Sequence, residues 1–165
     1  MNEDLDESIT LDGLDWRLLD LLQTDASLTN HALAEAAQVS PATALRRVKR
    51  LREARVIERF TALLAPRLAG RGLSAICEIT LDRQGDEHQA AFEARAVEDP
   101  AVQQCWRVSP GPDFVLVAWA PDMPAFHALT QRLFTQDANV RNVKTFFALK
   151  RAKFDPRVQG PELAR

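Results

Sequence analysis

Apolar residues recur with a helical period at the start of the chain. Within residues 11–24, four leucines share one face of a helix: Leu14, Leu18, Leu21 and Leu22. Their spacing of i, i+4, i+7 and i+8 predicts an amphipathic helix. Thr29 is a suitable N-cap for a second, short helix that ends near Gln38.

The pair Ser40-Pro41 predicts the start of a third helix, because serine caps free backbone amides and proline is tolerated at the first helical position. We expect this helix to run to about Ala54. Its apolar positions are Ala44, Val48 and Leu51. Its opposite side carries Thr43, Arg46, Arg47 and Arg50, with Lys49 at the edge. Residues 56–61 predict a strand, either a short wing or a connector to the next domain.

From residue 73 onward, short apolar runs replace the helical period. Strands are predicted at residues 73–81, 102–108, 114–120 and 140–149, and helices at 86–98 and 122–134. The order β-α-β-β-α-β is that of a ferredoxin-like fold, in which two helices cover one face of an antiparallel sheet. The free face and the open edges of such a sheet favour pairing with a second copy of the chain.

The expected class is therefore α+β, with a winged helix-turn-helix followed by the ferredoxin-like domain. The predicted organisation is an acidic tail (1–10), a helix-turn-helix domain (11–60), a linker (61–72), a second domain (73–155) and a C-terminal tail (156–165).

Charge is distributed unevenly along the chain, although the formal net charge is only −2. Residues 1–40 hold nine acidic and one basic residue, whereas residues 41–71 hold nine basic and two acidic residues. A local basic block, rather than the overall charge, governs attraction to phosphates. A basic helix face is more often simply solvated, so this block alone does not establish nucleic-acid binding.

Composition argues against several other classes. No apolar run approaches the roughly 18 residues of a membrane span, and the acidic N-terminus lacks the features of a secretory signal. Cys77 and Cys105 lie in apolar runs and are interpreted as reduced core thiols, which places the protein in the cytoplasm. With no CxxC or HxxxH pattern, we expect no metal, no cofactor and no catalytic residue.

Three helices with a short second one and a basic third one are typical of a helix-turn-helix, whose third helix enters the major groove of double-stranded DNA. The candidate DNA-binding residues are Ser40, Pro41, Thr43, Arg46, Arg47, Lys49 and Arg50. Thr43 and Arg46 are the preferred base readers. Arg50 is expected at phosphates, and Arg47 is expected to combine a structural role with phosphate contact.

The ordered set of motifs resembles the Lrp/AsnC family, the feast/famine regulators, over about residues 11–153. The residues that carry the resemblance are Leu11-Asp12-x-x-Asp15, Val39-Ser40-Pro41, Arg47-Val48-Lys49-Arg50-Leu51, Val108-Ser109, Asp113-Phe114 and Asp122-Met123.

The resemblance implies several further properties. The protein would bind a pseudo-palindromic operator as a homodimer or a larger assembly such as an octamer. Its second domain would be ACT-like (a RAM domain) and would bind an amino acid against the loop between its second and third strands. The candidate effector-binding residues are Ser109, Pro110, Gly111, Pro112 and Asp113.

This sequence departs from the family at several glycines. Pro110 stands where the family usually has glycine in that loop, and Arg55 and Gln38 replace glycines after and before the recognition helix. If position 55 is left-handed, arginine costs roughly 1 kcal/mol relative to glycine.

Two alternatives remain beside an effector-controlled transcription factor. The first alternative is an enzyme that uses histidines over a tetrapyrrole, because some haem-biosynthesis decarboxylases resemble this family in fold. The other is a DNA-binding assembly protein without an effector.

Overall fold

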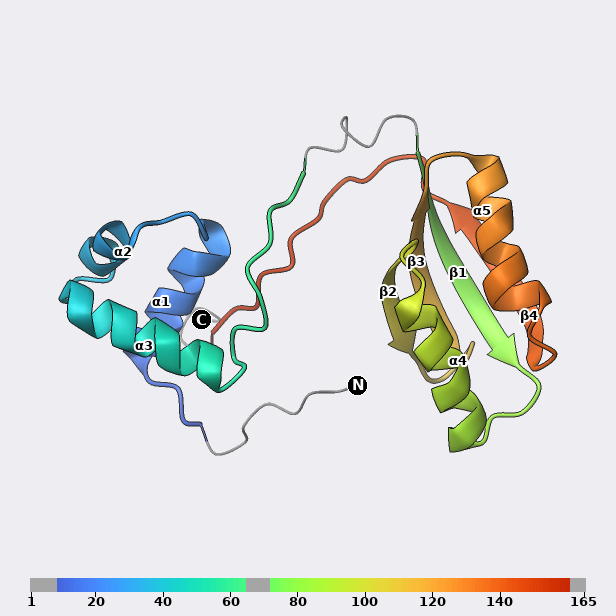
Figure 1. The fold of residues 1–165 in the computed structure, drawn as a ribbon, viewed down its shortest axis with the longest axis horizontal. Helices are drawn as coiled ribbons and strands as arrows, with labels where there is room; N and C mark the ends of the chain where they lie inside the picture. The colour runs from blue at the N-terminus through green and yellow to red at the C-terminus, as the bar shows by residue number, and fades with distance from the viewer. Residues whose placement is uncertain (1–8, 65–71, 161–165) are drawn as a thin grey trace. The chain divides into compact units, whose positions relative to one another are not determined.

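The computed structural model describes residues 9–64 and 72–160 of the chain. The chain divides into two compact units (Figure 1). The N-terminal unit comprises residues 1–63 together with 154–165, and the C-terminal unit comprises residues 64–153. Each unit is described separately below.

The N-terminal unit contains α1 (Gly13–Thr24), α2 (Asn30–Ala36) and α3 (Pro41–Glu53). Side chains define the three starts, since Asp12, Thr29 and Ser40 each accept a hydrogen bond from a backbone amide in the first turn. Asp12 is the N-cap of α1, so this helix begins after it rather than at the predicted residue 11. The predicted helices are confirmed with shifts of one or two residues at their ends.

One small hydrophobic core joins the three helices. Its buried members are Leu18, Leu33, Ala34, Ala37 and Ala44. Three of these are alanines, so the helix backbones approach closely. Two side-chain contacts fix α2 further: Asn30 Nδ2 donates to the carbonyl of Pro41 at 2.9 Å, and Arg17 donates to the carbonyl of Ala37 at 3.2 Å.

Two residues of this unit have a left-handed backbone. Gln38 has φ of 57° in the turn between α2 and α3, and Arg55 has φ of 56° just after α3. These are the positions where the family usually has glycine. The cost stated for Arg55 was conditional on a left-handed backbone, and that condition is met at Arg55 and also at Gln38.

The prediction of a strand at residues 56–61 is wrong, because these residues form only a bend and irregular structure. A strand requires a partner for its backbone hydrogen bonds, and no other described segment of the N-terminal unit is a strand. The segment is a connector, the other of the two alternatives. Phe60 is exposed and lies 5.8 Å from the guanidinium of Arg52.

The last described residues pack on α1. Gln23 and Val158 exchange two hydrogen bonds: the Gln23 amide donates to the Val158 carbonyl at 3.0 Å, and the Val158 N–H donates to the Gln23 carbonyl oxygen at 2.7 Å. Gly160 is buried against the ring of Trp16. This part of the predicted C-terminal tail is therefore a packed component of the N-terminal unit.

The C-terminal unit is the expected β-α-β-β-α-β arrangement. Its elements are β1 (Leu73–Leu81), α4 (Asp86–Glu98), β2 (Val102–Arg107), β3 (Phe114–Ala120), α5 (Met123–Thr130), the π-helical turn η2 (Gln131–Thr135) and β4 (Val140–Phe147). The sheet order is β2-β3-β1-β4, with all neighbours antiparallel. Both helices cover the same face of the sheet (Figure 1).

Alternation along the strands separates the two faces of the sheet. The helix-covered face contains the core, which includes Cys77, Ile79, Leu116 and Phe92. The other face carries Ile76, Trp106 and Phe146, which are 40%, 58% and 43% exposed. Ile76 pairs directly with Val117 and Phe146 in the register, so an apolar row crosses the open face.

One predicted helix has a different form. Residues 122–134 were expected to be a single helix, but α5 ends at Thr130 and the chain continues as η2, with Leu133 and Phe134 still buried. The wider turn keeps both side chains on the core side. Two residues of η2, Phe134 and Thr135, line a pocket.

Candidate functional site

The solvent-facing side of α3 carries Ala42, Leu45, Arg46 and Lys49. These four residues stand at i, i+3, i+4 and i+7, so they form one stripe along the helix. We call them the α3 stripe. Within the described residues the Arg46 side chain makes no hydrogen bond or ion pair, and Lys49 Nζ lies 3.7 Å from a carboxylate oxygen of the exposed Glu53. Leu45 is 61% exposed. The stripe therefore offers two cationic groups with an apolar side chain among them.

Arg47 and Arg50 point instead toward the start of α1. Arg47 donates to Asp12 at 2.6 Å and to Asp15 at 3.1 Å, and Arg50 donates to Asp15. The Asp15 side chain is fully buried. Asp12 and Asp15 also form a reciprocal capping box, each accepting from the other's backbone amide. The same two carboxylates thus begin α1 and anchor α3 to it.

Titration behaviour reflects this network. A hydrogen bond from the Asp15 backbone amide and another from Arg47 hold the pKa of Asp12 at about 2, below the ordinary 3.8. In return, the hydrogen bond to Asp12 raises the pKa of Arg47. Both groups are therefore charged throughout the neutral range, and Arg47 is committed mainly to this pairing.

The residues predicted at the start of α3 serve the helix itself. The Ser40 hydroxyl accepts from the Thr43 backbone amide at 3.2 Å and lies 2.9 Å from the Thr43 hydroxyl. Pro41 occupies the first turn. Thr43 is half-buried. The seven predicted residues thus separate into a cap (Ser40, Pro41, Thr43), an anchor (Arg47, Arg50) and two outward cations (Arg46, Lys49).

Two features of this site were missed at the sequence level. One is the role of Asp12 and Asp15 as partners of the arginines. A usable signal exists, because the two acids and the two arginines both stand three residues apart on their helices. The other is the exposed Leu45, which lies beside Arg46 and Lys49 and outside the apolar face of α3.

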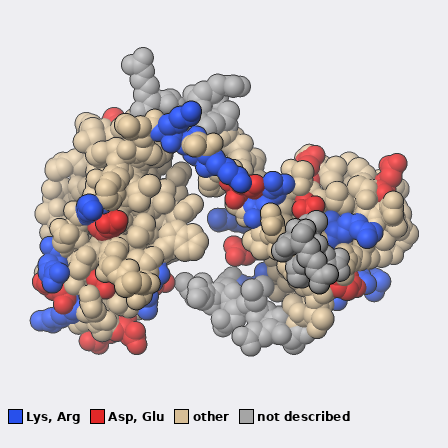
Figure 2. Space-filling model, turned by 180° about the vertical axis from the view of Figure 1, so that it is seen from behind, with Lys and Arg blue, Asp and Glu red and all other residues tan. Residues whose placement is uncertain are grey.

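The charge pattern on the surface is mixed. In the face shown in Figure 2, basic and acidic side chains are interspersed on both units. The local excess of arginine in residues 41–71 is thus partly balanced by ion pairs such as those with Asp12 and Asp15. The α3 stripe, in contrast, includes no acidic residue.

Comparison with known families matches both units. The AsnC-type helix-turn-helix domain matches residues 11–52, and the Lrp/AsnC ligand binding domain matches residues 74–158. The chain belongs to the Lrp/AsnC family. This Lrp/AsnC protein is thus a DNA-binding transcriptional regulator, with α3 in the position of the recognition helix.

Individual relatives agree over almost the full length. The leucine-responsive regulatory protein of Rhizobium meliloti is 36% identical over 88% of this chain and 93% of its own. The Bkd operon transcriptional regulator of Pseudomonas aeruginosa is 31% identical over 85% of this chain and 92% of its own.

Solved structures show the same fold. A transcriptional regulator from Neisseria meningitidis in complex with L-methionine superimposes with a TM-score of 0.83 at 30% identity, over 93% of this chain and 99% of that one. An AsnC family regulator from Agrobacterium tumefaciens gives a TM-score of 0.81 at 28% identity, over 90% of this chain and 96% of that one.

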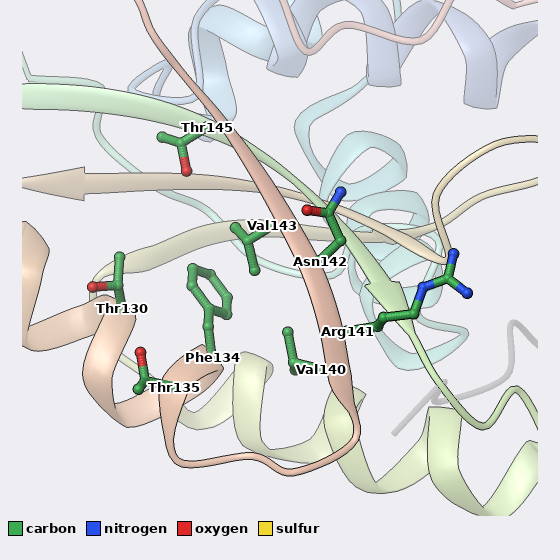
Figure 3. A pocket seen from close by; sticks show the side chains of 8 residues that line it. All are labelled: Thr130, Phe134, Thr135, Val140, Arg141, Asn142, Val143 and Thr145. Atoms are coloured by element: carbon green, nitrogen blue, oxygen red, sulfur yellow. The ribbon is translucent and has the colours of Figure 1, made fainter.

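A pocket of about 320 Å³ lies between η2 and β4 of this Lrp/AsnC protein (Figure 3). Its lining residues are Thr130, Phe134, Thr135, Val140, Arg141, Asn142, Val143 and Thr145. Phe134, Val140 and Val143 lie close together, whereas Arg141 extends away from them (Figure 3). The pocket thus has an apolar centre with hydroxyl and amide groups around it.

The predicted effector loop, residues 109–113, does not line this pocket. Its Asp113 is buried, and the carboxylate accepts from the backbone amide of Leu81 at 2.7 Å. Gly111 has φ of 126°, a conformation that requires glycine, and the Ser109-Pro110 bond is cis. The Asp113 side chain therefore holds the loop against the end of β1.

The remaining titratable side chains are dispersed. His31 lies on α2, His88 on α4 and His127 on α5. Burial raises the pKa of the Cys77 thiol and raises that of Cys105 to about 11. Residues 9–64 and 72–160 contain no group of His, Cys, Asp or Glu suited to a metal ion. Among the same residues, no helix is long and apolar enough to cross a membrane.

Proposed function

We propose that this regulator reads its operator with the α3 stripe, while Arg47 and Arg50 are held mainly by Asp12 and Asp15. The observation that carries the proposal is the split within α3 between outward Arg46 and inward Arg47 and Arg50. Arginine reads guanine through O6 and N7 in the major groove. We assign base reading to Arg46, assisted by Thr43, and phosphate contact to Lys49 and the exposed part of Arg50.

We propose further that the regulator works as a homodimer formed through the open face of the sheet. This face carries the apolar row of Val117, Ile76 and Phe146, with Trp106 on β2. Exposed apolar surface of this kind typically marks an interface.

A two-fold dimer predicts a pseudo-palindromic operator with half-sites about 34 Å apart or multiples of it. Such dimers can assemble further, for example into octamers. We propose the cytoplasm as its location, where relatives of this family would meet DNA.

An amino acid is the proposed effector. The related Neisseria regulator is solved with L-methionine. In the present chain, Ile79 of β1 pairs with Phe114 on one side and with Val143 on the other. The loop of residues 109–113 and the pocket-lining strand β4 thus flank the same end of β1. We propose that the effector binds at this end, against Ser109–Asp113.

Operator selection followed by footprinting tests these proposals. Selection from random DNA should yield a two-fold symmetric site, and footprints should show protection at helical-turn spacing. Titration of each of the twenty amino acids onto the bound complex should change the affinity or the footprint length for at least one of them. Selected sites without symmetry would exclude the dimeric docking. No response to any amino acid would leave a DNA-binding assembly protein without an effector.

A further inference from the structure

Leu45 is an unusual residue for the solvent-facing side of a recognition helix. It is 61% exposed, whereas the apolar residues that hold α3 in place, Ala44 and Leu51, are fully buried. It therefore contributes little to the three-helix core. Its neighbours on the stripe are Arg46 and Lys49, which attract DNA phosphates and base edges to the same surface.

Only one base presents an apolar group in the major groove, namely thymine with its C5-methyl group. A helix that enters the groove with the α3 stripe facing the bases brings Leu45 to the base edges beside Arg46. Ala42, one turn earlier on the stripe, is small and leaves room for close approach. We propose that Leu45 is a specificity-determining residue that contacts a thymine methyl group next to the base read by Arg46.

Uracil replacement tests this contact, because deoxyuridine lacks only the methyl group of thymidine. Each thymine of the selected operator is replaced in turn, and binding is measured by fluorescence anisotropy. At one thymine per half-site, the wild-type protein should lose about fourfold in affinity, the factor that corresponds to about 0.8 kcal/mol for one buried methyl group.

The variant Leu45→Ala completes a double-mutant cycle. It should bind the thymine operator more weakly and should no longer distinguish thymine from uracil at that position. Lys49→Ala is the matched control on the same stripe: it should weaken binding to all sequences and keep the fourfold discrimination. Because Leu45 is exposed, Leu45→Ala should have the same melting temperature as the wild type. Equal melting temperatures would exclude a folding defect as the cause of weaker binding.

Two results would overturn the proposal. One is that no uracil replacement weakens wild-type binding by twofold or more. The other is that Leu45→Ala retains the full discrimination. Either outcome would leave base reading by Arg46 intact, since it concerns a different base contact.

A second, independent observation concerns the outer face of α1. Trp16, Asp20 and Gln23 stand at i, i+4 and i+7, on a face that is not part of the three-helix core. Residues 155–160 cover this face through the paired amide hydrogen bonds of Gln23 and Val158 and through Gly160 on the Trp16 ring. Hydrogen bonds to Asp155, and to a lesser extent the charge of Asp20, raise the pKa of Arg157.

We infer that residues 155–160 form a strap that holds α1, the helix whose Asp12 and Asp15 anchor α3. The chain leaves the N-terminal unit after residue 63 and returns at residue 154. The strap is thus covalently continuous with the C-terminal unit and is attached to α1 by noncovalent contacts. Loss of the strap should therefore loosen α1 and weaken DNA binding.

Hydrogen exchange measured on the full chain tests the strap. Gln23→Ala removes both amide hydrogen bonds, and Gly160→Val places a Cβ within 2.7 Å of the Trp16 ring. Both variants should speed exchange of the Val158 amide and of the α1 amides about fivefold or more, and should weaken operator binding. Gln159→Val, at an exposed neighbouring position, is the matched control and should change neither the amide exchange rates nor operator binding. Rapid exchange of residues 155–160 in the wild type, or unchanged α1 exchange in both variants, would contradict the strap.

Discussion

Asp15 shows how one residue can organise a recognition helix. Its buried carboxylate accepts from Arg47 and Arg50 and closes the capping box of α1. The pattern Leu-Asp-x-x-Asp carried the family resemblance, but the sequence alone did not reveal this pairing, because the partners are 32 and 35 residues apart. Local rules such as capping can be read from neighbouring residues, whereas a contact between helices depends on how they pack.

Asp15→Asn should destabilise the N-terminal unit by about 2 to 3 kcal/mol. Removing one partner of a buried ion pair leaves the other charges uncompensated, although both arginines are partly exposed and keep some hydration. Urea denaturation followed by circular dichroism measures the change. Glu35→Gln, at an exposed position of α2, is the control. A loss below about 0.5 kcal/mol would show that the arginines do not depend on Asp15.

The lowered pKa of Asp12 predicts how the free energy of unfolding depends on pH. Its pKa in the folded protein is about 2, below the ordinary 3.8. Its contribution is therefore complete above pH 3.8 and is lost as the pH falls through about 2. The difference in urea midpoint between the wild type and Asp12→Asn should be constant from pH 5 to 7 and should shrink only below the ordinary pKa. A difference that disappears already at pH 5 would contradict the lowered pKa.

At the scale of elements, the accuracy of sequence-based prediction follows a physical division. β1, α4 and β3 begin and end as predicted, because apolar runs and turn residues define them locally. The π-helical turn at residues 131–135 was not predictable, since its apolar residues fit an ordinary helix equally well. The strand expected at residues 56–61 failed because strand formation depends on a partner, which periodicity cannot supply.

One substitution in the turn between α2 and α3 should increase the stability of the N-terminal unit. Gln38 adopts φ of 57°, where a side chain is disfavoured. Gln38→Gly should stabilise the N-terminal unit by up to about 1 kcal/mol, because glycine adopts this conformation without strain. Thermal unfolding followed by circular dichroism measures the gain. Glu35→Gly, in the last turn of α2, should instead destabilise the unit, because glycine disfavours the helical conformation. A loss of stability in Gln38→Gly would show that the side chain has a stabilising role.

At the scale of the whole molecule, the arrangement combines a DNA-reading unit with a sheet suited to pairing. Prediction of the candidate site succeeded in part at this scale. The outward position of Arg46 follows from the helical period of α3. Lys49, expected at the edge of that side, lies within the α3 stripe, whereas Arg47 and Arg50 pair with Asp12 and Asp15. The pocket between η2 and β4 was not foreseen, because it arises from the irregular turn and not from a motif.

Phe146→Lys tests the proposed dimer. A charge at this position, on the open face of the edge strand β4 beside Ile76, should shift the protein to monomer at micromolar concentrations, because the charge loses its hydration on pairing. Sedimentation velocity reports the change. Val97→Lys is the matched control, since Val97 is 60% exposed on α4, on the helix-covered side of the sheet. Retention of the wild-type assembly in Phe146→Lys would place the interface elsewhere.

The central claim is that Arg46 reads a base, and the ratio of specific to non-specific affinity tests it most directly. Arg46→Ala should weaken binding to the selected operator by about 1 to 3 kcal/mol and change binding to random DNA much less. Arg83→Ala, which removes one positive charge from the C-terminal unit, should leave the ratio unchanged. When both affinities are measured by fluorescence anisotropy at one fixed salt concentration, the ratio should collapse only in Arg46→Ala. An equal loss on operator and random DNA would contradict base reading by Arg46 and would show that Arg46 contacts phosphate.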